Sequence, residues 1–194
     1  MKSYRDLIEQ TFEFPQKEFK VRDHELLFND VPLMDIIKEY GTPLKLTYLP
    51  RISENIRYVQ ATFNGAMEKS KYNGTYTYCY CTKSSHFSFV MEEALKNKNV
   101  HMETSSSFDI PIVRSLHAKG IVTKDTYVLC NGFKRPLYMQ YITELLNDGF
   151  HNCIPILDNL FEMDHYEAGV KVPYKVGIRV AADEEPNFEF YTSR

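Results

Sequence analysis

The segment YCYCTKSSHF, residues 78–87, places a lysine at the end of a strand-like run of aromatic residues and cysteines. Strand interiors disfavour lysine, so Lys83 is either a surface charge or an amine that acts in a site. Three roles fit its position: partner in an ion pair, clamp for an anion, or nucleophile that forms a Schiff base with a carbonyl group. Burial would favour the last role, because a buried lysine amine loses its proton more readily.

Polar residues follow four further strand-like runs in the same way. They are Glu103 and Ser106 after VHM, Asn131 after TYVLC, Asp158 after NCIPIL, and Arg179 and Asp183 within YKVGIRVAADEE. In parallel α/β folds, ligands bind at the carboxyl ends of the strands. We therefore expect these residues to share one edge of a sheet with Lys83. The sequence has no glycine-rich GxGxxG or GxxxxGK[ST] motif, so a nucleotide-binding site lacks its main signal.

The elements that would position these residues alternate along the chain. Helices are predicted for residues 53–70, 86–97, 108–120, 136–148 and 159–169, and strands for residues 75–81, 100–104, 126–130, 152–157 and 174–180. Ser106 with Asp109 three residues later predicts a capping box, and Asp158 is the expected cap of the last helix. Strands that alternate with helices over short links indicate βα units and a parallel sheet.

The first part of the chain is less regular. A short helix is expected over residues 3–12, an extended segment over 24–30, a helix over 31–40 that Gly41 terminates, and a strand over 44–49.

Two parallel architectures compete for this pattern. An open doubly wound sheet is complete with about five or six strands, whereas a (β/α)₈ barrel needs eight over about 250 residues. The sequence ends in a new aromatic run, NFEFYTSR, with no helix to cover it. We therefore predict an incomplete TIM-like (β/α)₈ barrel whose chain ends before closure. Residues 1–40 would form an N-terminal extension and helix, and residues 41–194 the first portion of the barrel.

Composition narrows the class of protein. The 194 residues are 43% hydrophobic and 25% charged, with a net charge of -3 and no basic stripe for nucleic acid. Neither a signal peptide nor a membrane-spanning run is apparent. The four cysteines form no CxxC pair and lie in strand-like runs, so we expect reduced thiols in a cytoplasmic protein. The histidines form no ligand pair, and no metal is expected. His86 should lie at the solvent end of a helix, and His101 either in the core or beside a cofactor.

Several of these segments resemble one known family. YCYCTKSS resembles the strand-end lysine motif of the alanine racemase-like (fold type III) pyridoxal-phosphate enzymes, where an aromatic-Ala-x-Lys-x-Asn pattern carries the cofactor lysine. YGTPLKLTY, METSSSFDI and YKVGIRVAADE are similar to further segments of that family, in the same order. Within it, the basic amino acid decarboxylases match best, and among them the bacterial biosynthetic arginine decarboxylases, which also share DLIEQTF and CNGFKR.

The resemblance implies roles for particular residues. Lys83 would hold pyridoxal 5'-phosphate as a Schiff base and later assist proton transfer. Glu103 and Arg179 would lie near the cofactor, Cys81 stands where its ring rests, and Ser106 belongs to the same cofactor-binding segment as Glu103. Asp109 matches a glutamate at the start of the following helix. The implied reaction is decarboxylation of L-arginine to agmatine and CO₂ for polyamine (spermidine) biosynthesis in the cytoplasm, without nucleic acid or membrane partners.

The resemblance also implies that much of the enzyme lies beyond Arg194. The phosphate-binding loop, a ring-stacking histidine and a second, β-rich domain would all follow it, and the full-length enzyme would be a homodimer or a higher oligomer. The chain alone would then be inactive. Three alternatives stay open: a decarboxylase of diaminopimelate, lysine or ornithine; a non-catalytic pyridoxal-phosphate-binding protein; and a Schiff-base aldolase without a cofactor.

Overall fold

The computed structural model describes residues 18–180, which fall into two compact units that divide between Thr47 and Tyr48. The helix expected over residues 3–12 and the predicted rim residue Asp183 lie outside the described residues. No helix in the described range is both long and apolar enough to cross a membrane.

The N-terminal unit contains a small antiparallel sheet. Its strands are β1 (Phe19–Arg22), β2 (Glu25–Phe28) and β3 (Val31–Pro32), paired in the order β1-β2-β3. Two-residue loops join them, and Asp23, His24, Asn29 and Asp30 all have φ between 50° and 68°. Two consecutive residues with positive φ form the type I′ turn, which matches the twist of a hairpin and favours Asn and Asp. The extended segment predicted for residues 24–30 is confirmed as β2 and its turn.

Helix α2 (Leu33–Tyr40) follows this sheet and ends at Gly41, as predicted. Gly41 has a φ of 82°, and its N–H donates to the carbonyl of Ile37 at 2.7 Å. The strand predicted for residues 44–49 is wrong, because this run is not part of any strand. Its apolar alternation resembled a strand, but no strand among the described residues pairs with it, and a strand exists only through such pairing.

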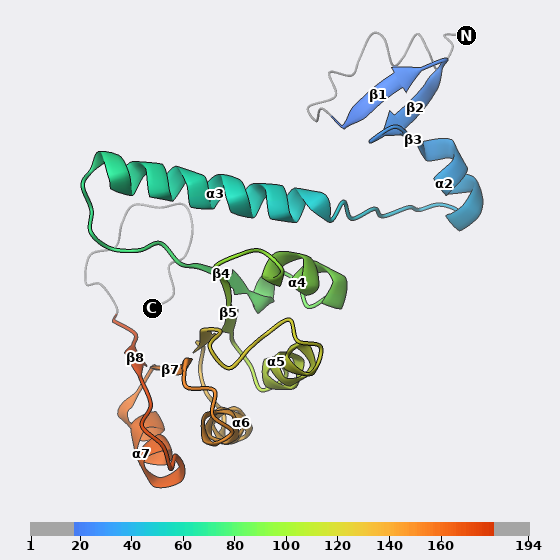
Figure 1. Ribbon diagram of the computed structural model, residues 1–194. Coiled ribbons are helices and arrows are strands. Elements are labelled where there is room, and N and C mark those ends of the chain that lie inside the picture. The colour runs from blue at the N-terminus through green and yellow to red at the C-terminus, as the bar shows by residue number, and fades with distance from the viewer. Residues whose placement is uncertain (1–17, 181–194) are drawn as a thin grey trace. The chain divides into compact units, whose positions relative to one another are not determined.

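The C-terminal unit confirms the predicted alternation of helices and strands (Figure 1). The helices are α3 (Pro50–Lys69), α4 (Ser88–Leu95), α5 (Asp109–Ala118), α6 (Pro136–Asn147) and α7 (Leu160–Gly169); the strands are β4 (Tyr78–Cys81), β5 (Val100–Thr104), β6 (Val128–Cys130), β7 (Cys153–Leu157) and β8 (Gly177–Ile178). Strand β4 is shorter than predicted because its first residue, Tyr78, pairs with Val100, where β5 begins. Residues 75–77 therefore have no partner on β5.

The five strands form a parallel sheet in the order β4-β5-β6-β7-β8. A doubly wound sheet reverses its strand order at a switch point, and this sheet does not. Right-handed crossovers that always advance in the same direction place every helix on the same face. Accordingly, α3 packs on α4, α5 on α6 and α6 on α7, and Figure 1 shows α4 to α7 following one another beside the strands. Within the described residues, β4 and β8 are the edges of the sheet.

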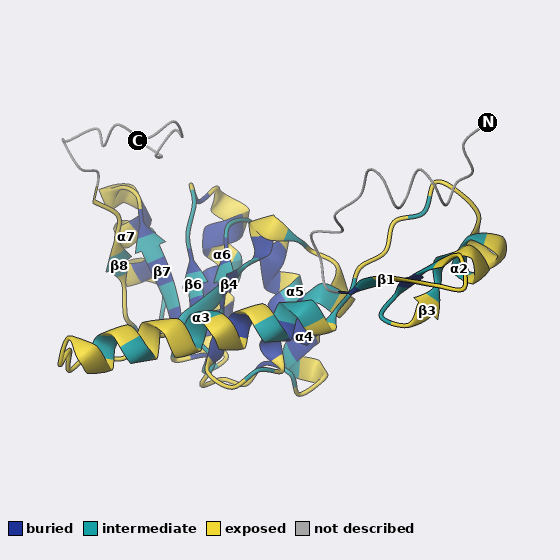
Figure 2. Ribbon diagram, turned by 90° about the horizontal axis from the view of Figure 1, so that it is seen from above, coloured by how far each residue is buried: buried dark blue, intermediate teal, exposed yellow. Residues whose placement is uncertain are grey.

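Buried and partly buried residues alternate along the strands of the sheet (Figure 2). Side chains that face the helices form the core and include Tyr80, Met102, Val128 and Cys153. Strands alternate their side chains, so the intervening residues lie on the opposite face, and they are only partly buried. We call this second surface the open face; it consists of Cys79, Cys81, His101, Glu103, Leu129, Ile154 and Ile156.

The four cysteines are free thiols, as the sequence predicted. Cys130 and Cys153 are fully buried on the helix side, and their sulfur atoms lie 3.6 Å apart. Cys79 and Cys81 are partly buried on the open face.

Candidate active site at the carboxyl ends of the strands

Because the strands are parallel, their carboxyl ends share one edge of the sheet, which we call the carboxyl rim. The residues that follow the strands there are Lys83 in the 3₁₀ turn Thr82–Ser84, Ser105 and Ser106 after β5, Asn131 and Gly132 after β6, Asp158 after β7, and Arg179 after β8. Of the predicted site residues in the range 18–180, Lys83, Ser106, Asn131, Asp158 and Arg179 thus follow the strands along this rim, whereas Cys81 and Glu103 lie within the ends of β4 and β5. The structure also shows which of them contact one another.

Lys83 is exposed, and its ammonium makes no hydrogen bond or ion pair within residues 18–180. The amine lies outside the core of the described residues because the turn projects beyond the last β4–β5 pair, Cys81 with Glu103. The backbone around Lys83 is nevertheless fixed. Ser84 Oγ donates to the carbonyl of Cys81 at 2.5 Å, and the Tyr80 hydroxyl donates to the carbonyl of Ser85 at 3.0 Å.

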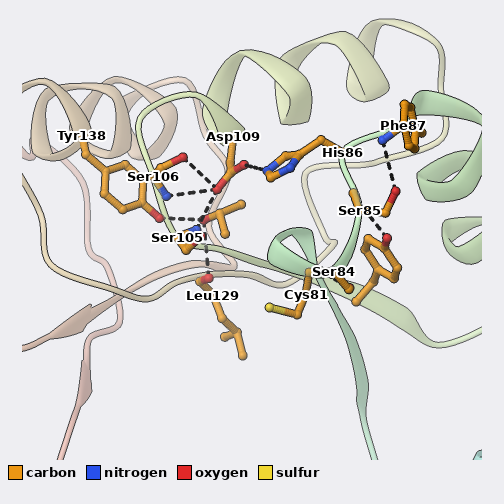
Figure 3. Close-up of polar contacts among 12 residues, drawn as sticks. Cys81, Ser84, Ser85, His86, Phe87, Ser105, Ser106, Asp109, Leu129 and Tyr138 are labelled. Carbon is orange, nitrogen blue, oxygen red and sulfur yellow. Dashed lines mark hydrogen bonds and ion pairs between the residues drawn. The ribbon is translucent and has the colours of Figure 1, made fainter. Parts of the chain in front are cut away.

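Asp109 joins the segment after Lys83 to the segment after Glu103 (Figure 3). Its carboxylate is fully buried and accepts hydrogen bonds at Oδ2 from the N–H groups of Ser105 (2.8 Å) and Ser106 (3.0 Å) and from Ser106 Oγ (3.2 Å). His86 Nε2 lies 2.9 Å from Asp109 Oδ1. His86 was predicted to begin the helix; instead α4 begins two residues later, at Ser88, and His86 is half exposed, as expected for the solvent end. Its contact with Asp109 was not anticipated.

The capping predictions at the rim are only partly correct. Helix α5 begins at Asp109, and no side chain caps it; the Asp109 carboxylate reaches back to Ser106, so only that half of the predicted capping box forms. Helix α7 is capped by Asn159 rather than Asp158, since Asn159 Oδ1 accepts from the N–H of Glu162 at 3.1 Å. Adjacent Asp and Asn residues are equally good caps, so the sequence could not distinguish them.

Glu103 lies on the open face and is held by a neighbouring amide. Its Oε1 accepts from Asn131 Nδ2 at 3.0 Å, and Asn131 Oδ1 accepts from the N–H of Gly132 at 2.9 Å. Gly132 has a φ of 79°, and a Cβ atom there would lie 3.0 Å from the carbonyl oxygen of Ser105. On the same face, burial and then the charge of Glu103 raise the pKa of the Cys79 thiol.

The other predicted residues occupy different parts of the rim and the open face. Cys81 is partly buried and pairs in register with Glu103. The Arg179 N–H donates to the carbonyl of Leu157 at 3.0 Å, and its guanidinium lies 3.9 Å from Asp158 Oδ1.

His101 makes a structural contact. Its Nδ1 accepts from the N–H of Tyr127 at 3.0 Å, its ring meets the Tyr127 ring edge-on, and burial lowers its pKa.

Sequence reasoning missed a buried ion pair beneath the rim. Lys134 Nζ lies 3.0 Å from Glu162 Oε2, and both side chains are at most 1% exposed. The same ammonium donates to the carbonyls of Gly132 (3.0 Å) and Ile156. A lysine in the charged segment FKR looks like a surface residue. Its only sequence signal is Glu162, in the first turn of α7. Among residues 18–180, no three His, Cys, Asp or Glu side chains converge as metal ligands would.

Comparison with known proteins adds one result. No protein-family model matches the chain. The crystal structure of the biosynthetic arginine decarboxylase SpeA from Campylobacter jejuni is similar to it, with a TM-score of 0.64 and 20% sequence identity over 84% of the chain. The fold is similar to one part of an arginine decarboxylase. The chain covers 29% of the length of that decarboxylase, and at this identity the likeness is one of fold alone.

Proposed function

We propose that the chain carries the lysine-bearing part of a pyridoxal-phosphate-dependent decarboxylase of a basic amino acid, with L-arginine converted to agmatine and CO₂. The observation that carries the proposal is the position of Lys83. Its amine stands free among the described residues, at the carboxyl rim of a sheet whose fold is similar to part of an arginine decarboxylase. The carboxyl rim is where parallel α/β folds place their chemistry. As further proposals, the sheet closes into a barrel in the whole enzyme and the protein acts in the cytoplasm.

The residues present fit the lysine end of such a cofactor site. Lys83 would bind the cofactor aldehyde, Cys81 and Glu103 would face it from β4 and β5, and Ser106 and Arg179 would contact it from the rim. Once bound, the cofactor supplies an electron sink for the pair left when CO₂ departs. The protein's own contribution would be nucleophilic and positional. The Lys83 amine would bind the aldehyde and later move a proton, and Glu103, held by Asn131, would present its carboxylate on the open face.

The proposal is tested by covalent trapping. The chain is incubated with pyridoxal phosphate, reduced with borohydride and digested, and the modified peptides are identified by mass spectrometry. We expect a pyridoxyl group at Lys83, and its loss in Lys83→Ala. Lys119→Ala, which removes a surface lysine that is paired with Glu92 at 2.6 Å, should leave the label in place. Labelling spread over surface lysines, with no preference for Lys83, would contradict the proposal.

The substrate is tested separately in the whole enzyme, by CO₂ release from carboxyl-labelled amino acids. We expect arginine to be used in preference to lysine, ornithine and diaminopimelate, with all turnover lost in Lys83→Ala. Borohydride trapping of a carbonyl substrate at Lys83 without added cofactor would instead favour an aldolase.

A further inference from the structure

We propose that Lys134 is a positioning residue for Glu103. Its buried ammonium holds the Asn131–Gly132 turn in the one conformation that aims the Asn131 amide at the Glu103 carboxylate. The inference rests on the proposed function, in which Glu103 works beside Lys83, but the contacts that carry it are independent of any cofactor.

Lys134 lies in a buried network of hydrogen bonds, which we call the node. Its three ammonium protons have three acceptors: Glu162 Oε2, the carbonyl of Gly132 and the carbonyl of Ile156. Glu162 is equally satisfied, because it also accepts from the N–H of Asp158 at 3.3 Å and from Asn159 Nδ2 at 3.3 Å. A lysine has three donors and no acceptor, so this site uses all of its hydrogen-bonding capacity. The node joins the turn after β6 to β7 and to the first turn of α7.

The node is linked through Gly132 to the turn after β6. Lys134 bonds the carbonyl of Gly132, while the N–H of the same residue bonds Asn131 Oδ1 at 2.9 Å. The φ of 79° at Gly132 is strained for any other residue type. The Gly132 carbonyl and N–H belong to the two peptide groups on either side of its Cα, and both are held, one by Lys134 and the other by Asn131 Oδ1. Holding the carbonyl therefore limits the directions that the N–H can take.

The turn is linked to Glu103 through the side chain of Asn131. Asn131 Oδ1 must accept from the Gly132 N–H, so the amide nitrogen is the atom that faces Glu103 Oε1 at 3.0 Å. A donor–carboxylate hydrogen bond of this kind is stronger than a neutral one. If the turn loosened, the amide could flip and place its oxygen against the carboxylate.

Stability alone does not account for the ion pair. Replacing a buried ion pair by apolar residues of similar volume is often neutral or stabilising. What an apolar pair cannot supply is a donor to Gly132. The geometry of the turn is thus the part of the structure that an apolar pair in place of Lys134 and Glu162 would not maintain.

The first experiment observes the Asn131 side-chain amide by NMR in the unliganded full chain. We expect its protons to be shifted by the carboxylate and protected from exchange, and Glu103→Gln to weaken both effects. Lys134→Met should remove them, with exchange about tenfold faster, as befits a lost hydrogen bond to a charged group. Because this variant leaves Glu162 buried without its partner, the double variant Lys134→Met with Glu162→Met keeps the test valid if the single variant unfolds.

The surface pair Lys119 and Glu92 provides the matched control, and Lys119→Met should leave the Asn131 signal unchanged. If the folded double variant keeps the shift and protection of the Asn131 amide, Lys134 does not position Glu103.

The second experiment measures the rate of pyridoxyl labelling at Lys83. The double variant should be labelled at Lys83 about tenfold more slowly than the unsubstituted chain. Adding Glu103→Gln to the double variant should not slow labelling beyond the rate of Glu103→Gln alone, because the effects of residues in one network are non-additive. Additive effects would overturn the inference. If Lys83 is not labelled even in the unsubstituted chain, the proposed function fails, and the NMR result alone decides the role of Lys134.

Discussion

At the scale of single residues, buried side chains at the rim form hydrogen bonds with the backbone of neighbouring strand–helix connections. The Asp109 carboxylate receives two N–H groups from the segment after β5 and meets His86 from the segment after β4. Lys134 does the same between β6, β7 and α7. In both cases a buried charge fixes a short connection that carries a candidate site residue.

Replacing Asp109 tests the first of these links. Asp109→Ala should lower the free energy of unfolding by about 1–3 kcal/mol, because the N–H groups of Ser105 and Ser106 lose their acceptor. The exposed pair Asp125 and His151, at 2.8 Å, is the matched control, and Asp125→Ala should cost less than about 1 kcal/mol. Urea denaturation compares the two variants, and equal losses would show that burial of Asp109 adds nothing.

His101 predicts a pH dependence. Burial lowers its pKa in the folded chain, so the unfolded chain binds the proton more tightly. The stabilising contribution is complete above the ordinary histidine pKa of about 6.5 and is lost as the pH falls through the lower folded value. His101→Gln, which still offers an acceptor to Tyr127, should flatten the fall in stability between neutral and mildly acidic pH. Urea midpoints across that range measure it, and an unchanged slope would contradict the prediction.

At the scale of elements, the spacing of hydrophobic residues predicted the whole alternation of helices and strands from α3 to β8. What they could not predict depends on contacts between elements. The run at residues 44–49 has a strand-like pattern, but no strand in the described range pairs with it. Helix α7 is capped by Asn159 instead of its neighbour Asp158. The burial of Lys134 needs acceptors from β7, α7 and its own turn, which no local pattern contains.

The turn after β6 gives a prediction at this scale. Gly132 and Gly120 have similar positive φ values, 79° and 73°, but a Cβ would meet the Ser105 carbonyl oxygen at 3.0 Å only at Gly132; none of the described atoms lies within 4 Å of one at Gly120. Gly120→Ala should therefore cost about 1–2 kcal/mol for its backbone alone, and Gly132→Ala more. Thermal unfolding of both variants tests this. Equal losses of stability would mean that the turn can move away from the Ser105 carbonyl without cost.

At the scale of the whole C-terminal unit, one face of the sheet is covered by helices and the other is only partly buried. The sequence predicted the parallel sheet, and the strand order settles which face the helices cover. The site residues were predicted as a set because strand ends can be located from the pattern. Their mutual contacts could not be, since they depend on register.

Thiol chemistry distinguishes the two faces. Iodoacetamide should modify Cys79 and Cys81 in the folded chain, and Cys130 and Cys153 only after unfolding, because the latter two have no exposed surface. The raised pKa of Cys79 should make its reaction slow near neutral pH and faster in alkali. Mass spectrometry of the digested chain assigns the sites. Early modification of Cys130 or Cys153 would mean that the helices do not cover that face.

The sequential order of the sheet also has a kinetic consequence. Each strand pairs with the one that precedes it, as Tyr78 does with Val100 and Val128 with Cys153, so no pairing in this sheet spans much more than two dozen residues. Loop-closure entropy rises only slowly with length, and here it is nearly the same for every pair. Nucleation is therefore not confined to one place: any two adjacent βα units can form first, and the sheet can grow from them in both directions.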